Sequence, residues 1–125
     1  MKMTITEKCS LFKPYLKSGQ WCMGNKPETV NIIDLINIPW QSQHDLVDSI
    51  RQAPTKDEKS ILKKQLWAFT PSSVMKDGRG VNYVHQHNGL MAFDIDGIKD
   101  QIIEVFNAIK LIPYTLYCGK SASGN

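Results

Sequence analysis

The chain has 125 residues, of which 42% are hydrophobic, so it is long enough to bury one core and too short for two ordinary domains. Its net charge of +3 by itself indicates neither a nucleic-acid-binding protein nor a membrane-surface protein. Cys9, Cys22 and Cys118 are too widely spaced for a zinc knuckle or a CxxC redox pair, and three free thiols are typical of a cytoplasmic protein. The chain has no signal-peptide core and no run of about 18 apolar residues, so we expect no membrane partner.

The first forty residues predict a strand, an irregular segment and a short helix. Residues 3–12 alternate loosely enough to form an opening strand, and residues 14–27 are rich in turn-forming residues. Thr29 can cap a helix that runs through residue 36 and closes before Pro39.

Two further helices frame the most basic part of the chain. Apolar residues at helical spacing predict a helix over residues 44–51. Thr55 and Glu58 form the capping box of a second helix over residues 56–66. Residues 51–80 hold seven Lys or Arg against three acidic residues, so the positive excess of the chain lies here. A solvated helix face and a surface for phosphate are both compatible with this charge.

The remaining pattern alternates between strands and one amphipathic helix. Strands are predicted over residues 67–70, 90–96 and 114–118, with a flexible turn at residues 76–80. Apolar residues at i, i+4, i+7, i+8 and i+11 predict a helix over residues 98–109. The fold class is therefore α+β, with a small mixed sheet packed with helices and a right-handed βαβ unit at the C-terminal end.

The predicted strand over residues 90–96 ends in Asp94 and Asp96. In a strand of period two both carboxylates lie on one face, where they need a counter-cation. An aligned pair of this kind commonly holds a divalent metal. The alternative is a simple strand-to-helix turn, in which one Asp caps the helix that follows.

Two other groups of residues have chemistry that suits a ligand. Residues 119–125 combine glycines with serine hydroxyls and Lys120, which suit a phosphate, although such a tail is also typical of a terminus without fixed structure. His85 and His87 could join a transition-metal site, or could simply belong to a polar loop or strand edge.

The sequence of residues 90–97, LMAFDIDG, is similar to the first motif of haloacid dehalogenase-type phosphatases. In that family the first Asp is a phosphorylated nucleophile and the second is an acid/base. The later motifs of the family need a longer remainder than the 29 residues that follow Asp96. A phosphohydrolase of this type is therefore the third-ranked hypothesis.

A second resemblance covers about 75 residues from Ile50 onward. It is carried, in this order, by the segments Ile50-Arg51, Lys59, LKKQLWAFTPSS (62–73), HNGL (87–90), FDID (93–96) and YCGKSASG (117–124). Together they resemble the VirE-type N-terminal domain of mobile-element and phage-derived bacterial proteins, which is similar to archaeo-eukaryotic primases. The resemblance implies a primase-like or RRM-like core.

The resemblance also implies a role for each group of site residues. Asp94 and Asp96 would be the catalytic metal pair that holds Mg²⁺ or Mn²⁺ against the phosphates of a nucleotide. The residues implied to contact the nucleotide are Lys120, Ser121, Ser123 and Gly124. The residues implied to face phosphate or template are Arg51, Lys63 and Lys64.

We therefore expect residues 1–125 to be a single primase-like domain that works with nucleotides and single-stranded nucleic acid in a replication or mobilisation protein. The basic residue and the third acidic residue that a primase site needs would lie beyond Asn125. The chain is accordingly interpreted as a truncated piece of a longer protein, with a helicase-like ATPase domain in the same polypeptide. The alternative is a non-catalytic interaction module that keeps the fold.

Overall fold

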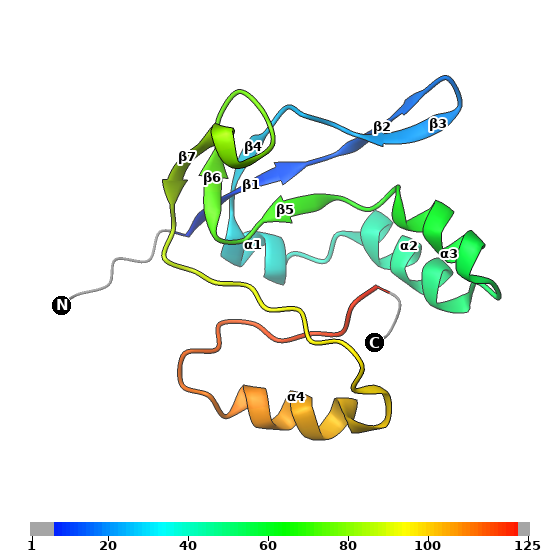
Figure 1. The fold of residues 1–125 in the computed structure, drawn as a ribbon, viewed down its shortest axis with the longest axis vertical. Coiled ribbons are helices and arrows are strands. Elements are labelled where there is room, and N and C mark those ends of the chain that lie inside the picture. Colours follow the sequence, from blue (N-terminus) through cyan, green and yellow to red (C-terminus); the bar gives the residue numbers. More distant parts are fainter. Residues whose placement is uncertain (1–6, 123–125) are drawn as a thin grey trace.

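The computed structural model describes residues 7–122, and its fold is α+β, as the sequence predicts (Figure 1). The strands are β1 (Lys8–Phe12), β2 (Pro14–Lys17), β3 (Gln20–Met23), β4 (Glu28–Asn31), β5 (Ala68–Thr70), β6 (Ser73–Met75) and β7 (Val84–His87). The helices are α1 (Ile32–Asn37), α2 (Gln41–Gln52), α3 (Lys56–Lys63) and α4 (Ile102–Lys110), with short 3₁₀ turns at Val81–Tyr83 and Lys99–Gln101. Among residues 7–122, none of these helices is long and apolar enough to cross a membrane.

The core is built around β1, the central strand of an antiparallel sheet with the order β4-β1-β5. From Cys9 to Phe12 every residue of β1 is buried, because the strand lies between β4 and β5 and also packs against β6. Burial raises the pKa of the Cys9 thiol, so this cysteine stays protonated and unreactive. The predicted opening strand is confirmed over β1, and residues 3–6 lie outside the described part.

A buried serine joins this sheet to the β6–β7 hairpin. The Ser10 hydroxyl accepts a hydrogen bond from the Met75 backbone N–H (2.7 Å) and lies 3.4 Å from the Met75 carbonyl oxygen. The Thr70 hydroxyl donates to the Ser73 carbonyl (2.8 Å) across the tight turn between β5 and β6. A polar residue in the middle of β1 is therefore satisfied by two neighbouring segments rather than by a ligand.

The N-terminal third contains more strand than the sequence pattern predicts. Residues 14–27, expected to be irregular, form the β2–β3 hairpin. Its turn residues Ser18 and Gly19 have φ of 51° and 76°, the left-handed pair typical of a two-residue hairpin turn. The prediction that Thr29 caps the next helix is wrong, since Thr29 lies in β4 opposite Ser10. Its β-branched side chain suits the strand, and Asn31 caps α1 instead.

The two middle helices are present as predicted, but α3 ends at Lys63 and not at residue 66. α2 extends the predicted 44–51 helix at both ends, and its Ile50 is fully buried. The Thr55 hydroxyl accepts a hydrogen bond from the Glu58 N–H (3.2 Å), which confirms the capping residue of α3. The rings of Trp40 and Trp67 meet edge to face at 5.4 Å and hold α2 against the start of β5.

The C-terminal part differs from the prediction. Residues 90–96 and 114–118 do not form strands, so the expected βαβ unit is absent from the described residues. Asn88 and Gly89 explain why residues 90–96 form no strand. Gly89 has φ of 80°, which turns the chain away from β6, so the pairing of β6 with β7 ends at His87. The predicted amphipathic helix is confirmed, as a 3₁₀ turn that leads into α4.

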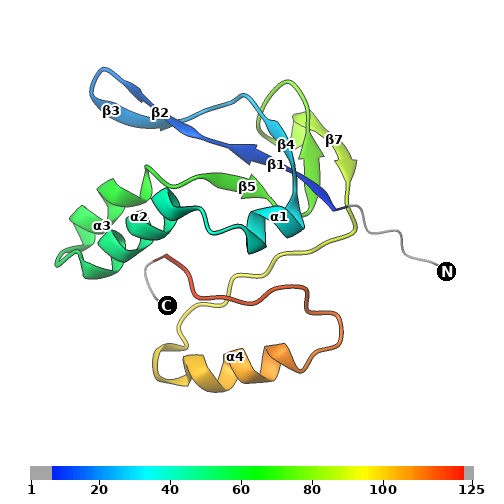
Figure 2. The same cartoon turned by 180° about the vertical axis from the view of Figure 1, so that it is seen from behind.

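Asn88 ties the C-terminal part to the core. Its side-chain amide donates to the carbonyl oxygens of Lys8 (3.1 Å) and Pro71 (2.7 Å), and its side-chain oxygen accepts from the Leu90 N–H (3.0 Å). Asn88 is fully buried, and no residue from 89 to 122 is buried. Seen from both sides, α1, α2 and α3 lie between most of the strands and α4 (Figures 1 and 2).

We predict that Asn88→Ala lowers the free energy of unfolding by about 3 kcal/mol, because the carbonyls of Lys8 and Pro71 and the N–H of Leu90 lose their partner at a part-buried site. Urea denaturation followed by circular dichroism measures the change. The matched control Asn82→Ala removes an exposed amide from the Val81–Tyr83 turn and should change the free energy by less than about 0.5 kcal/mol. Equal effects of the two variants would contradict the role of Asn88.

Candidate functional site

The two predicted metal ligands lie on an exposed, extended segment that follows Asn88. Asp94 and Asp96 are both exposed, and neither carboxylate accepts a hydrogen bond or joins an ion pair within residues 7–122. Gly97 follows with φ of 74° and turns the chain toward the 3₁₀ turn before α4. Because residues 90–96 form no ladder, the shared strand face expected for the carboxylates is not formed.

These two carboxylates can supply only part of a metal site. Within the described part of the chain, no group of three or more His, Cys, Asp or Glu side chains is arranged to hold a metal ion. His85 and His87 lie exposed on β7 and belong to no such group among the described residues. Asp94 and Asp96 suit Mg²⁺ or Mn²⁺ by ligand type, with the remaining oxygens coming from water or from a phosphate ligand.

One hydrogen bond joins two predicted site residues that are far apart in the sequence. Arg51 lies in the last turn of α2, and its guanidinium donates to the backbone carbonyl of Ser121 (3.3 Å), seventy positions later in the chain. Both residues are exposed, so the guanidinium keeps donors for a further ligand. The end of α2 and the Ser/Gly-rich segment therefore share one surface.

The other predicted basic residues lie at the end of the next helix. Lys63 is the last residue of α3 and Lys64 is its C-cap, and both are exposed. Neither forms an ion pair in the part of the chain that the structure describes, where Lys13 and Glu28 do so at 3.5 Å. Two free ammonium groups at a helix C-terminus can contact a polyanion without first breaking an internal pair.

Lys120 lies in a different environment from the one predicted for it. It lines an apolar hollow between α4 and the C-terminal segment, with a volume of about 370 Å³, together with Ile102, Ile103, Phe106, Cys118 and Gly119. A side chain at Gly119 would collide with the Tyr117 ring, so the backbone passes closely at this point. Ser123 and Gly124, also predicted to contact a nucleotide, lie outside the described residues.

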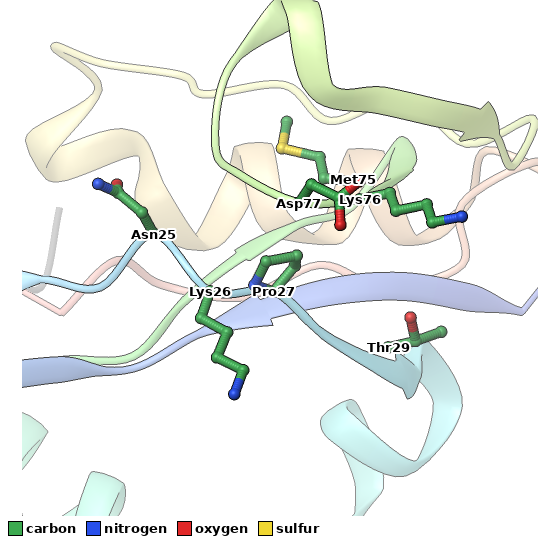
Figure 3. Close-up of a pocket in the computed structure, with 7 residues that line it drawn as sticks. All are labelled: Asn25, Lys26, Pro27, Thr29, Met75, Lys76 and Asp77. Atoms are coloured by element: carbon green, nitrogen blue, oxygen red, sulfur yellow. The ribbon is translucent and has the colours of Figure 1, made fainter.

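A second cavity was not predicted from the sequence (Figure 3). It has a volume of about 480 Å³ and is lined by Asn25, Lys26, Pro27, Thr29, Met75, Lys76 and Asp77. Its two loops are turn-rich in sequence, but nothing in the sequence pattern indicates that they meet, because about fifty residues separate them. The side chains of Lys26 and Lys76 point in different directions, so they do not gather positive charge on one ligand (Figure 3).

Comparison with known proteins places the C-terminal half of the chain in a family. The model of the family described as BT4734-like, N-terminal domain, matches residues 61–125, about half of the chain. This segment contains Lys63, Lys64, Asp94 and Asp96 and the C-terminal segment, whereas Arg51 precedes it. No curated protein and no solved structure matches the chain.

The contact between Arg51 and Ser121 predicts that the C-terminal segment is held against α2. Trypsin cleaves between Lys120 and Ser121, and the Ser121 carbonyl accepts the hydrogen bond from Arg51. We expect Arg51→Gln to raise the rate of that cleavage roughly two- to fivefold, because one hydrogen bond to a charged group is lost. Mass spectrometry of the early products measures the rate. The control Arg79→Gln, at another exposed arginine, should leave it unchanged, and an unaltered rate in Arg51→Gln would show that the contact holds nothing in place.

Proposed function

The chain belongs to the BT4734-like N-terminal domain family, and we propose that it binds a metal–nucleotide complex and single-stranded nucleic acid in a primase-like manner. The proposal keeps the VirE-type resemblance of the sequence, with the domain working inside a larger replication or mobilisation protein of the cytoplasm. The observation that carries it is the hydrogen bond between Arg51 and Ser121. The resemblance assigns both residues to phosphate binding, and the fold places them in contact.

The proposal assigns the acidic pair to the same site. Asp94 and Asp96 are exposed and have no partner within residues 7–122, so a metal would not have to displace an existing contact. When bound, Mg²⁺ or Mn²⁺ would neutralise the phosphate charge that these carboxylates otherwise repel. Arg51 and Ser121 would contact the phosphates, Arg51 through the donors of its guanidinium.

Lys63 and Lys64 would contact the nucleic-acid backbone. Lysines bind phosphate as flexible point charges, so their contribution is independent of base sequence and strongly dependent on salt. They lie side by side at the C-terminus of α3, where the partial negative charge of the helix end stabilises two ammonium groups. They would add affinity for the strand, while Arg51 binds the nucleotide.

A non-catalytic interaction module is the second candidate function. Two observations favour it: the described residues provide two acidic ligands and no third, and large apolar side chains are exposed after Asn88. Such a domain would keep the fold and bind partners without transferring a nucleotide. The experiments below separate the two candidates, since an interaction module has no need of metal or triphosphate.

The first experiment measures thermal stability with Mn²⁺ and a nucleoside triphosphate. At a ligand concentration about tenfold above Kd, we expect the melting temperature to rise by about 5 °C. Asp94→Asn combined with Asp96→Asn should abolish the rise, because the ligand oxygens of the metal are lost. Asp100→Asn, which removes a nearby exposed carboxylate, should keep it. A wild-type melting curve unchanged by Mn²⁺ and triphosphate would refute nucleotide binding.

The second experiment measures the affinity for single-stranded DNA as a function of salt. Lys63→Gln with Lys64→Gln should reduce the slope of log K against log salt by about 1.4, since two phosphate contacts to a single strand are lost. The matched control Lys26→Gln with Lys76→Gln removes two lysines from the cavity of Figure 3 and should not change the slope. If both double variants lower the slope equally, binding follows net charge and not this surface.

A further inference from the structure

The β2–β3 hairpin forms an arm that extends away from the β4-β1-β5 sheet (Figures 1 and 2). It follows β1 directly after Phe12, and its ladder is lengthened by a hydrogen bond from the Gly24 N–H to the Lys13 carbonyl (3.1 Å). The arm closes in the two-residue turn at Ser18–Gly19, and residues 15–20 are all exposed. It is therefore a regular two-stranded ribbon whose outer end is open to solvent.

The arm is basic and contains no acidic residue. Residues 13–27 include Lys13, Lys17 and Lys26 and no Asp or Glu. Lys17 forms no ion pair within residues 7–122, whereas the Nζ of Lys13 lies 3.5 Å from a carboxylate oxygen of Glu28. An exposed ribbon with this charge attracts a polyanion and repels a basic partner.

One side of the arm has an aromatic ring between two lysines. Side chains two positions apart in a strand lie on the same face, about 7 Å apart, so Lys13, Tyr15 and Lys17 share one side. Tyr15 pairs with Cys22 and Lys17 pairs with Gln20, so the cross-strand neighbours are uncharged. The Tyr15 side chain is 49% exposed. This side therefore offers an accessible ring with a cation on each side of it.

The same side of the arm is continuous with the lysines at the end of α3. The Nζ of Lys13 lies over the Trp67 ring, 4.6 Å from its centroid. Trp67 belongs to the short connection between α3 and β5, three positions after Lys64 and four after Lys63. The contact between Lys13 and Trp67 thus joins the base of the arm to the surface that is proposed to bind a nucleic-acid strand.

We propose that the β2–β3 arm is a second contact for single-stranded nucleic acid, in which an unpaired base stacks on Tyr15 and a neighbouring phosphate meets Lys17. This contact rests on the proposed function, because it extends the strand-binding surface of Lys63 and Lys64. Stacking on an aromatic side chain requires an unpaired base, so the partner is a single strand and not a duplex. Every base has a flat face, so the contact tolerates any base sequence.

Fluorescence anisotropy with a labelled oligothymidylate of about 20 nucleotides tests the contact. Tyr15→Ala should weaken binding roughly 5- to 100-fold and leave the salt slope unchanged, because a base loses its stacking partner and no charge is removed. Tyr15→Phe keeps the ring and should bind like the wild type. Lys17→Gln should reduce the slope of log K against log salt by about 0.7. The matched control Tyr114→Ala, at a tyrosine 92% exposed outside the arm, should bind normally.

A polyanion without bases separates stacking from charge. Tyr15→Ala should bind inorganic polyphosphate as tightly as the wild type does, and circular dichroism checks that the variant is folded. An equal loss of affinity for polyphosphate and for the oligonucleotide would overturn the stacking contact.

The Lys63→Gln, Lys64→Gln double variant separates this contact from the proposed function. If that variant lowers the salt slope while Tyr15→Ala and Lys17→Gln bind normally, the arm is refuted and the proposed strand-binding surface stands. If the wild-type chain does not bind the oligonucleotide, both the arm and the proposed strand binding are refuted.

Discussion

The arrangement of this protein depends on one buried amide. Asn88 is fully buried, and its side chain bonds to the carbonyls of Lys8 and Pro71 and to the N–H of Leu90. These bonds join the central strand β1, the turn after β5 and the start of the extended segment that carries Asp94 and Asp96. All described residues that form the core precede residue 89. Asn88 is thus the point where a packed N-terminal part ends and an open C-terminal part begins.

The division has consequences for function. The N-terminal part supplies rigid supports, among them the end of α2 with Arg51 and the end of α3 with Lys63. The C-terminal part supplies the free carboxylates, the serine segment and the apolar outer face of α4. A segment that buries little apolar surface opens easily, and this is a common property of regions that order around a ligand or a partner. The hydrogen bond between Arg51 and Ser121 links the two parts at the proposed site.

Much of the fold could be predicted from local patterns, and the errors have physical causes. The capping residue Thr55 and the apolar spacing of α4 are local signals, and both were correct. Thr29 is a good cap in isolation, but the neighbouring strand β1 recruits it into the sheet. The alternation of residues 90–96 is a strand pattern without a neighbouring strand to pair with, because Asn88 and Gly89 turn the chain away. The contact between Arg51 and Ser121 and the cavity beside Lys76 each join residues far apart in sequence, which no local pattern can show.

The central claim is that the acidic pair and the Arg51–Ser121 contact form one nucleotide site. Line broadening of backbone amide signals by Mn²⁺ in the presence of a nucleoside triphosphate measures this most directly, because the paramagnetic ion marks the residues around it. The account predicts that the broadening is strongest near Asp94 and Asp96 and includes Arg51 and Ser121. Broadening at the cavity of Lys26 and Lys76, or an even spread over all exposed acidic residues, would contradict it.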